Sequence, residues 1–223
     1  MKVKYSKTEA HQRYRLANND IVSGVTTIIR ENLGWNAAAL IAWSRKEAMA
    51  GRDPLKIKEK AADVGTLAHF MIACHLKGDE PDLSEFSPAD VSKAENCFLA
   101  FLDWEKKHSV KVAHVERQLV SEHWRYGGTS DFDGEVDGEI AVVDYKSGKD
   151  IYLEYKIQGA ALAQLYFEQE PFNSPWPKFY VLKLGQDGDF QYAKVSNLEK
   201  YWEVFYHCLE LHNLKKALKG EQP

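Results

Sequence analysis

The spacing of apolar side chains divides the chain into a mainly helical first half and a second half where strands alternate with helices. Apolar residues three or four positions apart predict helices over residues 36–50, 53–76, from 87 onward, 153–169 and 198–218. β-branched and aromatic residues predict strands over residues 111–120, 129–136, 139–146, 179–184 and 190–195. Residues 1–20 look irregular, and residues 21–30 fit either a strand or the start of a helix capped by a threonine.

Capping residues set the ends of several of these helices. We expect N-caps at Asn36, Asp53, Ser87 and Asn197, with a proline after Asp53 and after Ser87. Leu40 and Trp43 are expected on the apolar face of the first of these helices. A glycine inside a helix costs about 1 kcal/mol relative to alanine, so Gly65 is expected where another segment approaches closely.

The hairpin over residues 127–146 organises the second half of the chain. Asp137 and Gly138 suit the two left-handed positions of a type I′ turn. Counting outward from that turn places Asp131 directly opposite Asp144, and Lys146 emerges on the same face as Asp144. A bulge in either strand would shift this register.

Two like charges facing each other across strands destabilise a sheet unless a cation lies between them, which makes Asp131 and Asp144 candidate ligands of a hard divalent ion. An exposed, solvated pair of carboxylates explains the pattern equally simply. His69 is a third candidate ligand, or a core histidine with a satisfied hydrogen bond. If the loop over residues 121–126 is symmetric, Glu116 lies beside Asp131; alternatively it is an exposed strand acid.

Composition narrows the class of protein. With 223 residues, 44% of them hydrophobic and 28% charged, the chain is long enough for one sizeable core, and we expect a single domain over residues 1–223. No apolar run approaches the length of a membrane span, and the first residues lack the apolar segment of a secretory signal. The three scattered cysteines suit a reducing, intracellular compartment.

The charge distribution is uneven although the net charge is only −4. Residues 1–60 hold twelve Lys or Arg and six Asp or Glu, whereas the rest of the chain is acidic. A basic first part beside an acidic metal site suits a polyanionic substrate, and a solvated surface of uneven charge is the alternative. One or two Mg²⁺ or Mn²⁺ ions there would activate water, with Lys146 orienting or deprotonating the water or stabilising developing charge.

Four motifs in this order resemble the PD-(D/E)xK nuclease superfamily, in its RecB-like branch of phage-type and mitochondrial genome maintenance exonucleases. They are Gly65-Thr66-x-x-His69, Glu116, Gly128-x-x-Asp131 and Asp144-Tyr145-Lys146, and the segment over residues 25–28 also resembles phage members. The resemblance implies an α+β (α/β) fold: a restriction-endonuclease-like core with a central mixed sheet flanked by helices and an N-terminal helical arch. The mainly helical part would span residues 1–110, and the sheet core with the last helix residues 111–223.

The resemblance also implies roles for single residues. Metal ligands would be His69, Asp131 and Asp144; catalytic residues would be Lys146, Asp144, Asp131, Glu116 and Gln158; DNA contacts would come from Thr66, Ser147, Tyr155 and Gln158. The branch usually has a tyrosine four residues after this glutamine, but Leu162 stands there. The iron–sulphur cluster of some relatives is not expected, because its four cysteines are missing.

The activity implied is a Mg²⁺- or Mn²⁺-dependent DNA exonuclease at single-stranded or frayed ends, in recombination, repair or replication, in the cytoplasm of a bacterial or phage-infected cell. A structure-specific endonuclease and a catalytically silent DNA-binding subunit on the same fold are the alternatives. Arg45, Lys46 and Trp43 are guesses for residues that track a DNA strand. No membrane partner is expected, and the oligomeric state is left open.

Overall fold

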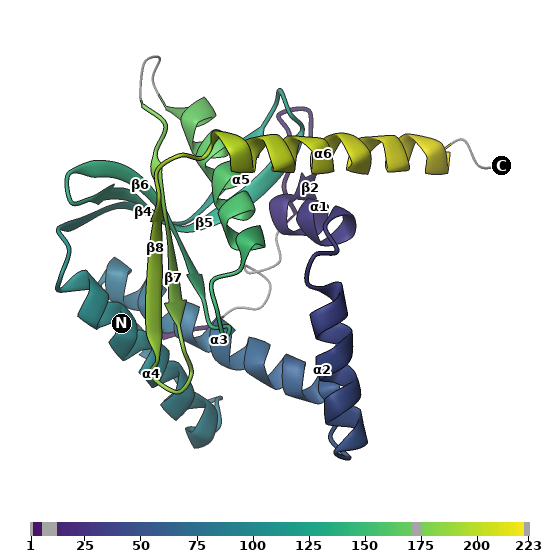
Figure 1. Ribbon diagram of the computed structural model, residues 1–223. Helices are drawn as coiled ribbons and strands as arrows, with labels where there is room; N and C mark the ends of the chain where they lie inside the picture. The colour runs from purple at the N-terminus through teal and green to yellow at the C-terminus, as the bar shows by residue number, and fades with distance from the viewer. Residues whose placement is uncertain (1, 6–12, 171–174, 221–223) are drawn as a thin grey trace.

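A mixed β-sheet with helices on both faces forms the centre of the molecule (Figure 1). The computed structural model describes residues 2–5, 13–170 and 175–220. The helices are α1 (Val25–Asn32), α2 (Ala37–Met49), α3 (Pro54–Lys77), α4 (Pro88–Glu105), α5 (Leu153–Gln169) and α6 (Glu199–Gly220). The strands are β1 (Lys2–Lys4), β2 (Ser23–Gly24), β3 (Glu80–Asp82), β4 (Val110–Ser121), β5 (Tyr126–Val136), β6 (Glu139–Lys146), β7 (Lys178–Leu184) and β8 (Phe190–Val195). The predicted α+β class, with a central mixed sheet flanked by helices, is therefore confirmed.

The sheet has the order β2-β5-β6-β7-β8, and β4 pairs with the other edge of β5. Strands β2 and β5 run parallel, as do β6 and β7, while the β4–β5, β5–β6 and β7–β8 pairs are antiparallel. All three antiparallel pairs join consecutive strands as hairpins, whereas β7 reaches β6 only after α5 has crossed over, as a parallel pair requires.

The β5–β6 hairpin has the predicted turn and register. Asp137 and Gly138 have φ angles of 53° and 80°, both in the left-handed region that a type I′ turn needs. Val136 faces Glu139 and Phe132 faces Val143, which is the predicted register. The paired residues end there, one position before Asp131 and Asp144.

Each face of the sheet is covered by its own apolar cluster. Helices α1, α5 and α6 cover one face, where Ile157, Leu165 and Phe205 are buried against Val142 and Phe179. Helices α3 and α4 cover the opposite face, where their buried side chains include Leu67, Ile72 and Phe101. This two-sided burial explains the near-continuous apolar runs of β6 and β7.

The ends of α3 and α4 agree with the sequence. The Asp53 side chain accepts a hydrogen bond from the backbone N–H of Leu55 at 2.9 Å, and Gly78 ends α3 with φ 73°. Ser87 Oγ accepts from the N–H of Asp90 at 3.2 Å at the start of α4. Helix α5 covers the predicted residues 153–169.

Several expectations were wrong. Residues 25–32 form helix α1, but Gly24 precedes it without a side-chain cap, so no threonine caps it. Asn36 does occupy the predicted N-cap position of α2, but its side chain makes no capping hydrogen bond and instead donates to Glu154 Oε1 at 2.6 Å. Leu198, not Asn197, occupies the cap position of α6, because its carbonyl accepts the first helical bond from Trp202.

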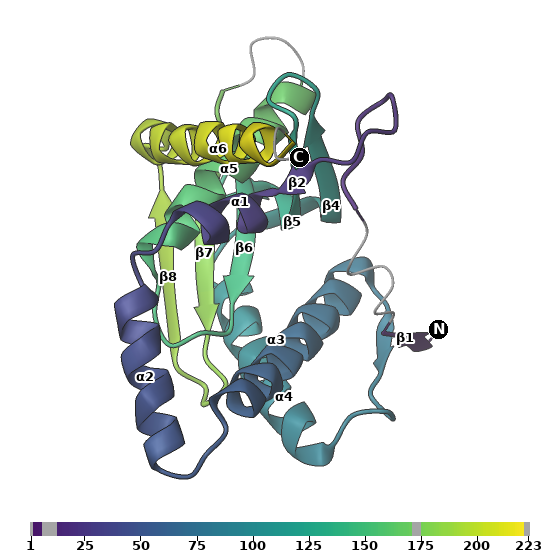
Figure 2. The same cartoon turned by 90° about the vertical axis from the view of Figure 1, so that its right-hand side faces the viewer.

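Helix α2 differs most from its prediction, since none of its residues is buried. It stands at the side of the molecule between α1 and α3 (Figure 2). Leu40 is 50% exposed, and Trp43 is only half-buried. Strands β1 and β3, which pair with each other, were not predicted. The connection between the helix predicted over residues 153–169 and the strand predicted over residues 179–184 lies partly outside the described residues. Among the helices described, none is both long and apolar enough to cross a membrane.

Candidate active site

A fork in the sheet creates the place where the candidate residues meet. Strand β4 pairs with one edge of β5 along its whole length. On the other edge, β2 pairs with Tyr126 and Gly127, and β6 pairs only from Phe132 onward. In the described part of the chain, residues 128–131 therefore have no strand beside them on that edge, and Asp131 lies at the point where β6 diverges.

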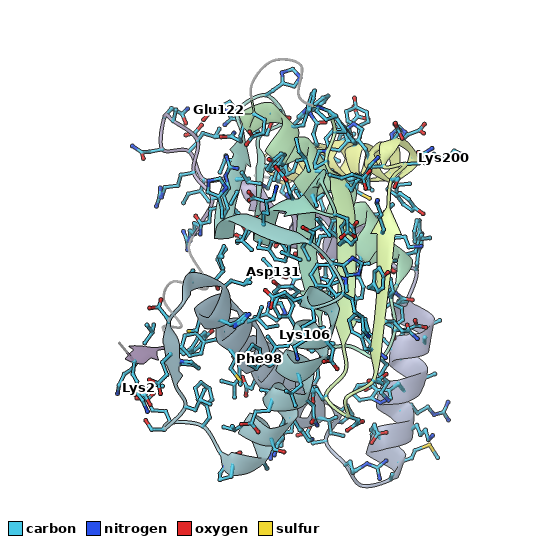
Figure 3. The ribbon with its side chains drawn as sticks, turned by 90° about the vertical axis from the view of Figure 1, so that its left-hand side faces the viewer. Lys2, Phe98, Lys106, Glu122, Asp131 and Lys200 are labelled. Atoms are coloured by element: carbon cyan, nitrogen blue, oxygen red, sulfur yellow. The ribbon has the colours of Figure 1, made fainter. Side chains whose placement is uncertain are left out.

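The fork opens into a cleft of about 1370 Å³ between α3 and the sheet. Figure 2 shows α3 below the ends of β5 and β6, and Figure 3 shows Asp131 between the sheet and the helical part that carries Phe98 and Lys106. Each residue to which the motif resemblance gave a catalytic, metal or DNA role lines this cleft: Thr66, His69, Glu116, Asp131, Asp144, Lys146, Ser147, Tyr155 and Gln158. The residues were far apart in the sequence, and the fold brings them together.

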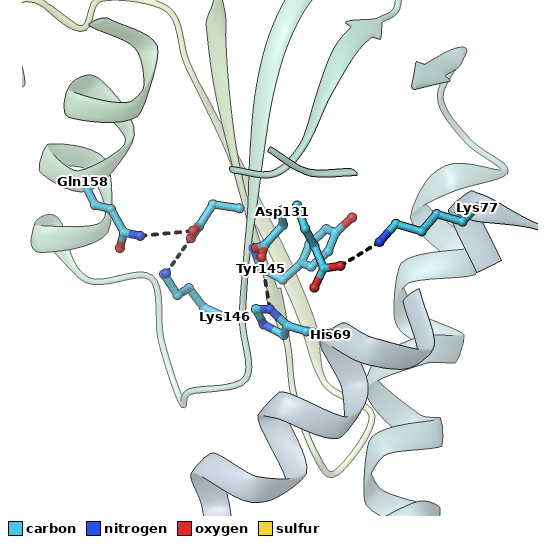
Figure 4. A network of polar contacts seen from close by, with 8 residues as sticks. His69, Lys77, Asp131, Tyr145, Lys146 and Gln158 are labelled. Carbon is cyan, nitrogen blue, oxygen red and sulfur yellow. Dashed lines mark hydrogen bonds and ion pairs between the residues drawn. The ribbon is translucent and has the colours of Figure 1, made fainter. Parts of the chain in front are cut away.

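A polar network joins five of these residues (Figure 4). On one side, the His69 imidazole Nδ1 lies 3.1 Å from Asp131 Oδ1, and the backbone N–H of Tyr145 donates to Asp131 Oδ2 at 2.5 Å. On the other side, Lys146 Nζ lies 2.6 Å from Asp144 Oδ2, and Gln158 Nε2 donates to Asp144 Oδ1 at 3.2 Å. Helices α3 and α5, which cover opposite faces of the sheet, thus each supply a partner to one aspartate.

Burial and neighbouring charge act against each other on these groups. Burial raises the pKa of Asp144; Lys146 opposes this and Asp131 adds to it, so the pKa stays above its usual value. Burial also acts to raise the pKa of Asp131, but His69, Lys146 and the backbone N–H of Tyr145 together outweigh it, so the pKa is lowered. For His69, burial favours the neutral ring, yet the charge of Asp131 raises its pKa. The two aspartates therefore have different environments although they come from adjacent strands.

Glu116 lies beside Asp131, as the symmetric loop predicted. The pairs Val115–Phe132 and Arg117–Ser130 bracket the two residues on β4 and β5. Glu116 has φ 55°, which is unusual for a residue other than glycine and is a form of local strain often found at functional sites. Its carboxylate accepts a hydrogen bond from Lys77 Nζ at 2.8 Å on the wall of the cleft.

The remaining predicted residues border this network. Tyr155 contacts Lys146 through its ring, with Lys146 Nζ 5.1 Å from the ring centroid, so a tyrosine does reach the lysine although none follows Gln158 by four residues. Gly65 is the close approach that was expected, since a Cβ there would lie 2.3 Å from Ser147 Oγ. Thr66 is exposed on the α3 wall. Arg45 and Lys46 do not line the cleft.

The carboxylate oxygens of Asp131 and Asp144 fit a hard divalent cation such as Mg²⁺ or Mn²⁺, whereas the imidazole of His69 is a donor more typical of transition metals. Asp144 Oδ2 is buried, and its close contact with Lys146 is an ion pair outside hydrogen-bond geometry, so no described residue gives this oxygen a hydrogen bond. Yet no three His, Cys, Asp or Glu side chains within residues 2–5, 13–170 and 175–220 are grouped as a ready-made metal site. Asp131, Asp144 and His69 are the residues that would hold such a cation.

Lys77 and Tyr14 are among the residues of the cleft wall that sequence reasoning missed. Lys77 pairs with Glu116 and lies two turns beyond His69 on α3, but nothing in its spacing distinguishes it from a solvated lysine. Tyr14 precedes the predicted elements in a stretch that looked irregular. Its signal was indirect, because Gly24 and Gly127 are strand glycines outside turns, and such glycines often mark a close approach.

Comparisons with known proteins add little to this geometry. No protein-family model matches the chain, and no curated protein matches it. A solved structure from Eubacterium rectale described as "Putative exonuclease" is 18% identical, with a TM-score of 0.48 over 74% of this chain and 69% of that one. The structure of SSO0001 is 13% identical, with a TM-score of 0.34 over 56% of this chain and 59% of that one. Similarities this distant carry no argument about function.

Proposed function

We propose that the chain is a Mg²⁺- or Mn²⁺-dependent deoxyribonuclease of the PD-(D/E)xK superfamily, with a restriction-endonuclease-like core, that acts as an exonuclease on single-stranded or frayed DNA ends. The observation that supports the proposal is the contact network in the cleft, where Asp131, Asp144, Lys146 and Gln158 meet His69. Its assignment to DNA recombination, repair or replication rests on the resemblance of the sequence motifs alone.

The chain's own groups would divide the work. Asp131 and Asp144 would hold the cation, with His69 as a further ligand or as the group that orients Asp131. Such an ion supplies Lewis-acid chemistry, since it activates water and neutralises charge on a phosphoryl oxygen. Lys146 would bring a positive charge to the phosphate, and Gln158 would fix the rotamer of Asp144. Glu116, held by Lys77, would be a third acid beside Asp131.

A second candidate is a DNA-binding protein of the same fold without catalysis. One observation favours it: Asp131 is paired with His69 and Asp144 with Lys146, and the described residues include no group of three acidic, cysteine or imidazole side chains arranged as a metal site. This candidate keeps the cleft as a binding surface but gives the carboxylates only a structural role.

Labelled DNA distinguishes the candidates. Linear single- and double-stranded DNA, labelled separately at the 5′ and 3′ ends, and circular single-stranded DNA would be incubated with the purified chain in Mg²⁺, Mn²⁺ or EDTA. We expect nucleotide release from linear DNA with either metal, none in EDTA, and an intact circle. Cleavage of the circle would establish an endonuclease. Binding of DNA ends without release of nucleotides in Mn²⁺ would support the DNA-binding protein without catalysis.

A further inference from the structure

Two glycines that pair across neighbouring strands lie beneath one aromatic ring. Gly24 of β2 and Gly127 of β5 are partners in the parallel register. A Cβ on Gly127 would lie 2.4 Å from Tyr14 Cγ, and a Cβ on Gly24 would lie 2.8 Å from Tyr14 Cε2. Gly24 has an ordinary extended backbone with φ −79°. We therefore attribute these glycines to the room that the Tyr14 ring needs, and not to the conformation of the strands.

Tyr14 is fixed in place before any ligand arrives. The backbone N–H of Val22 donates to the Tyr14 carbonyl at 3.0 Å, and Leu16, two residues on, is buried. The Tyr14 hydroxyl shares a hydrogen bond of 3.0 Å with Thr129 Oγ1. A ring held in this way loses little conformational entropy on binding, so it is suited to act as a preformed stacking surface.

The ring lies on the wall of the cleft that holds the candidate active site. Tyr14 and Arg13 both line the cleft with Asp131. Thr129, which holds the Tyr14 hydroxyl, precedes Asp131 by two residues on β5, a separation of about 7 Å along a strand. An aromatic ring and a guanidinium beside a phosphodiester site are the groups that bind a base and a phosphate of a single strand.

We infer that Tyr14, seated on Gly24 and Gly127, forms a subsite that stacks a base of a nucleic-acid strand, next to the nucleotide whose phosphate reaches Asp131 and Asp144. The inference rests on the proposed function and adds to it a fixed point through which the strand passes. Tyr14 is thus a positioning residue, with Arg13 adding positive charge at the same wall. The alternative is that the ring only fills the space above the two glycines.

A base analogue that reports stacking separates these roles. A set of single-stranded oligonucleotides would be used, each carrying one 2-aminopurine at a different distance from the end. The fluorescence of this base falls when it stacks. Binding would be measured in EDTA and again with Ca²⁺. Tyr14→Phe keeps the ring and removes the hydroxyl, whereas Tyr14→Leu keeps apolar bulk over the glycines and removes the aromatic face. Tyr192→Leu is the matched control, since Tyr192 is 45% exposed and lies outside the cleft.

The wild type, Tyr14→Phe and Tyr192→Leu should all quench the fluorescence of 2-aminopurine at one position near the end of the oligonucleotide. Tyr14→Leu should lose that quenching and bind about 5- to 150-fold more weakly, the range that corresponds to ~1–3 kcal/mol for one stacked base. Quenching that persists in Tyr14→Leu, or is absent in a wild type that binds and degrades DNA, would overturn the stacking subsite and leave the proposed function standing. If the wild type neither binds nor degrades DNA, the proposed function fails and the subsite falls with it.

Discussion

Replacing Gly159 with alanine tests how closely α5, the helix that carries Gln158, lies on the sheet. A Cβ at residue 159 would lie 2.1–2.4 Å from three atoms of the Phe179 ring on β7. Carbon atoms in contact are normally about 3.5–4.0 Å apart. Phe179 is completely buried, so its ring cannot turn away into solvent.

Two opposing effects determine the result. Alanine improves helix propensity by about 1 kcal/mol over glycine. Extra volume in a packed core costs about 1–3 kcal/mol, and an overlap of more than 1 Å with Phe179 belongs at the upper end of that range. We therefore expect Gly159→Ala to lower the free energy of unfolding by about 2 kcal/mol, or the Tm by about 4–8 °C for a chain of this size.

Urea unfolding followed by circular dichroism measures the change, and a double-mutant cycle identifies its cause. In a Phe179→Leu background the overlap is smaller, so Gly159→Ala should cost much less or stabilise the chain. DNA degradation by Gly159→Ala should also fall, because Gln158 moves with the helix away from Asp144. An unfolding free energy that is unchanged or higher in the single variant would show that α5 does not lie on Phe179 in this way.

Three further predictions concern stability and thiol chemistry. Asp53→Ala removes the cap of α3 and should lower the unfolding free energy by about 1 kcal/mol in urea titrations, and an unchanged midpoint would count against the cap. Burial raises the pKa of Cys97 to about 11, and all three cysteines are buried, so the native protein should react with a thiol reagent only on unfolding; rapid labelling of native protein would contradict this. Asp133 is fully buried against His114 at 2.7 Å and Arg117 at 3.6 Å, so Asp133→Ala should destabilise the chain by about 1.5–3 kcal/mol in thermal unfolding, and a wild-type Tm would refute that pairing.

Features that depend on a few adjacent residues could be predicted from the sequence. The Asp137-Gly138 turn fixes the β5–β6 register, because only a few residues accept two successive left-handed positions. The Asp53 cap and Gly78 set both ends of α3 for similarly local reasons. Since β4 and β5 are joined by a short loop, the neighbourhood of Glu116 and Asp131 also followed from chain order.

Features that depend on distant partners could not be predicted. Strand β2 has two residues, and its pairing with β5 leaves no periodic pattern in the sequence. The apolar residues of α2 look like a core face, but none of them is buried. Within the site, the ion pair of Lys146 with Asp144 and the hydrogen bond of Lys77 to Glu116 depend on side-chain conformations. The pattern of apolar and polar residues predicts helices and strands, but not these conformations. The catalytic, metal and DNA roles of these residues remain predictions.

The most direct test of the central claim, that Asp144 belongs to a metal-dependent nuclease centre, is DNA degradation by matched variants. Asp144→Asn keeps the shape of a side chain that is only 5% exposed, while Glu135→Gln alters a carboxylate on β5 outside the cleft. With equal Tm values established first, we expect Glu135→Gln to release nucleotides from end-labelled DNA in Mg²⁺ at the wild-type rate. Asp144→Asn should release almost none, and wild-type release by folded Asp144→Asn would contradict the account.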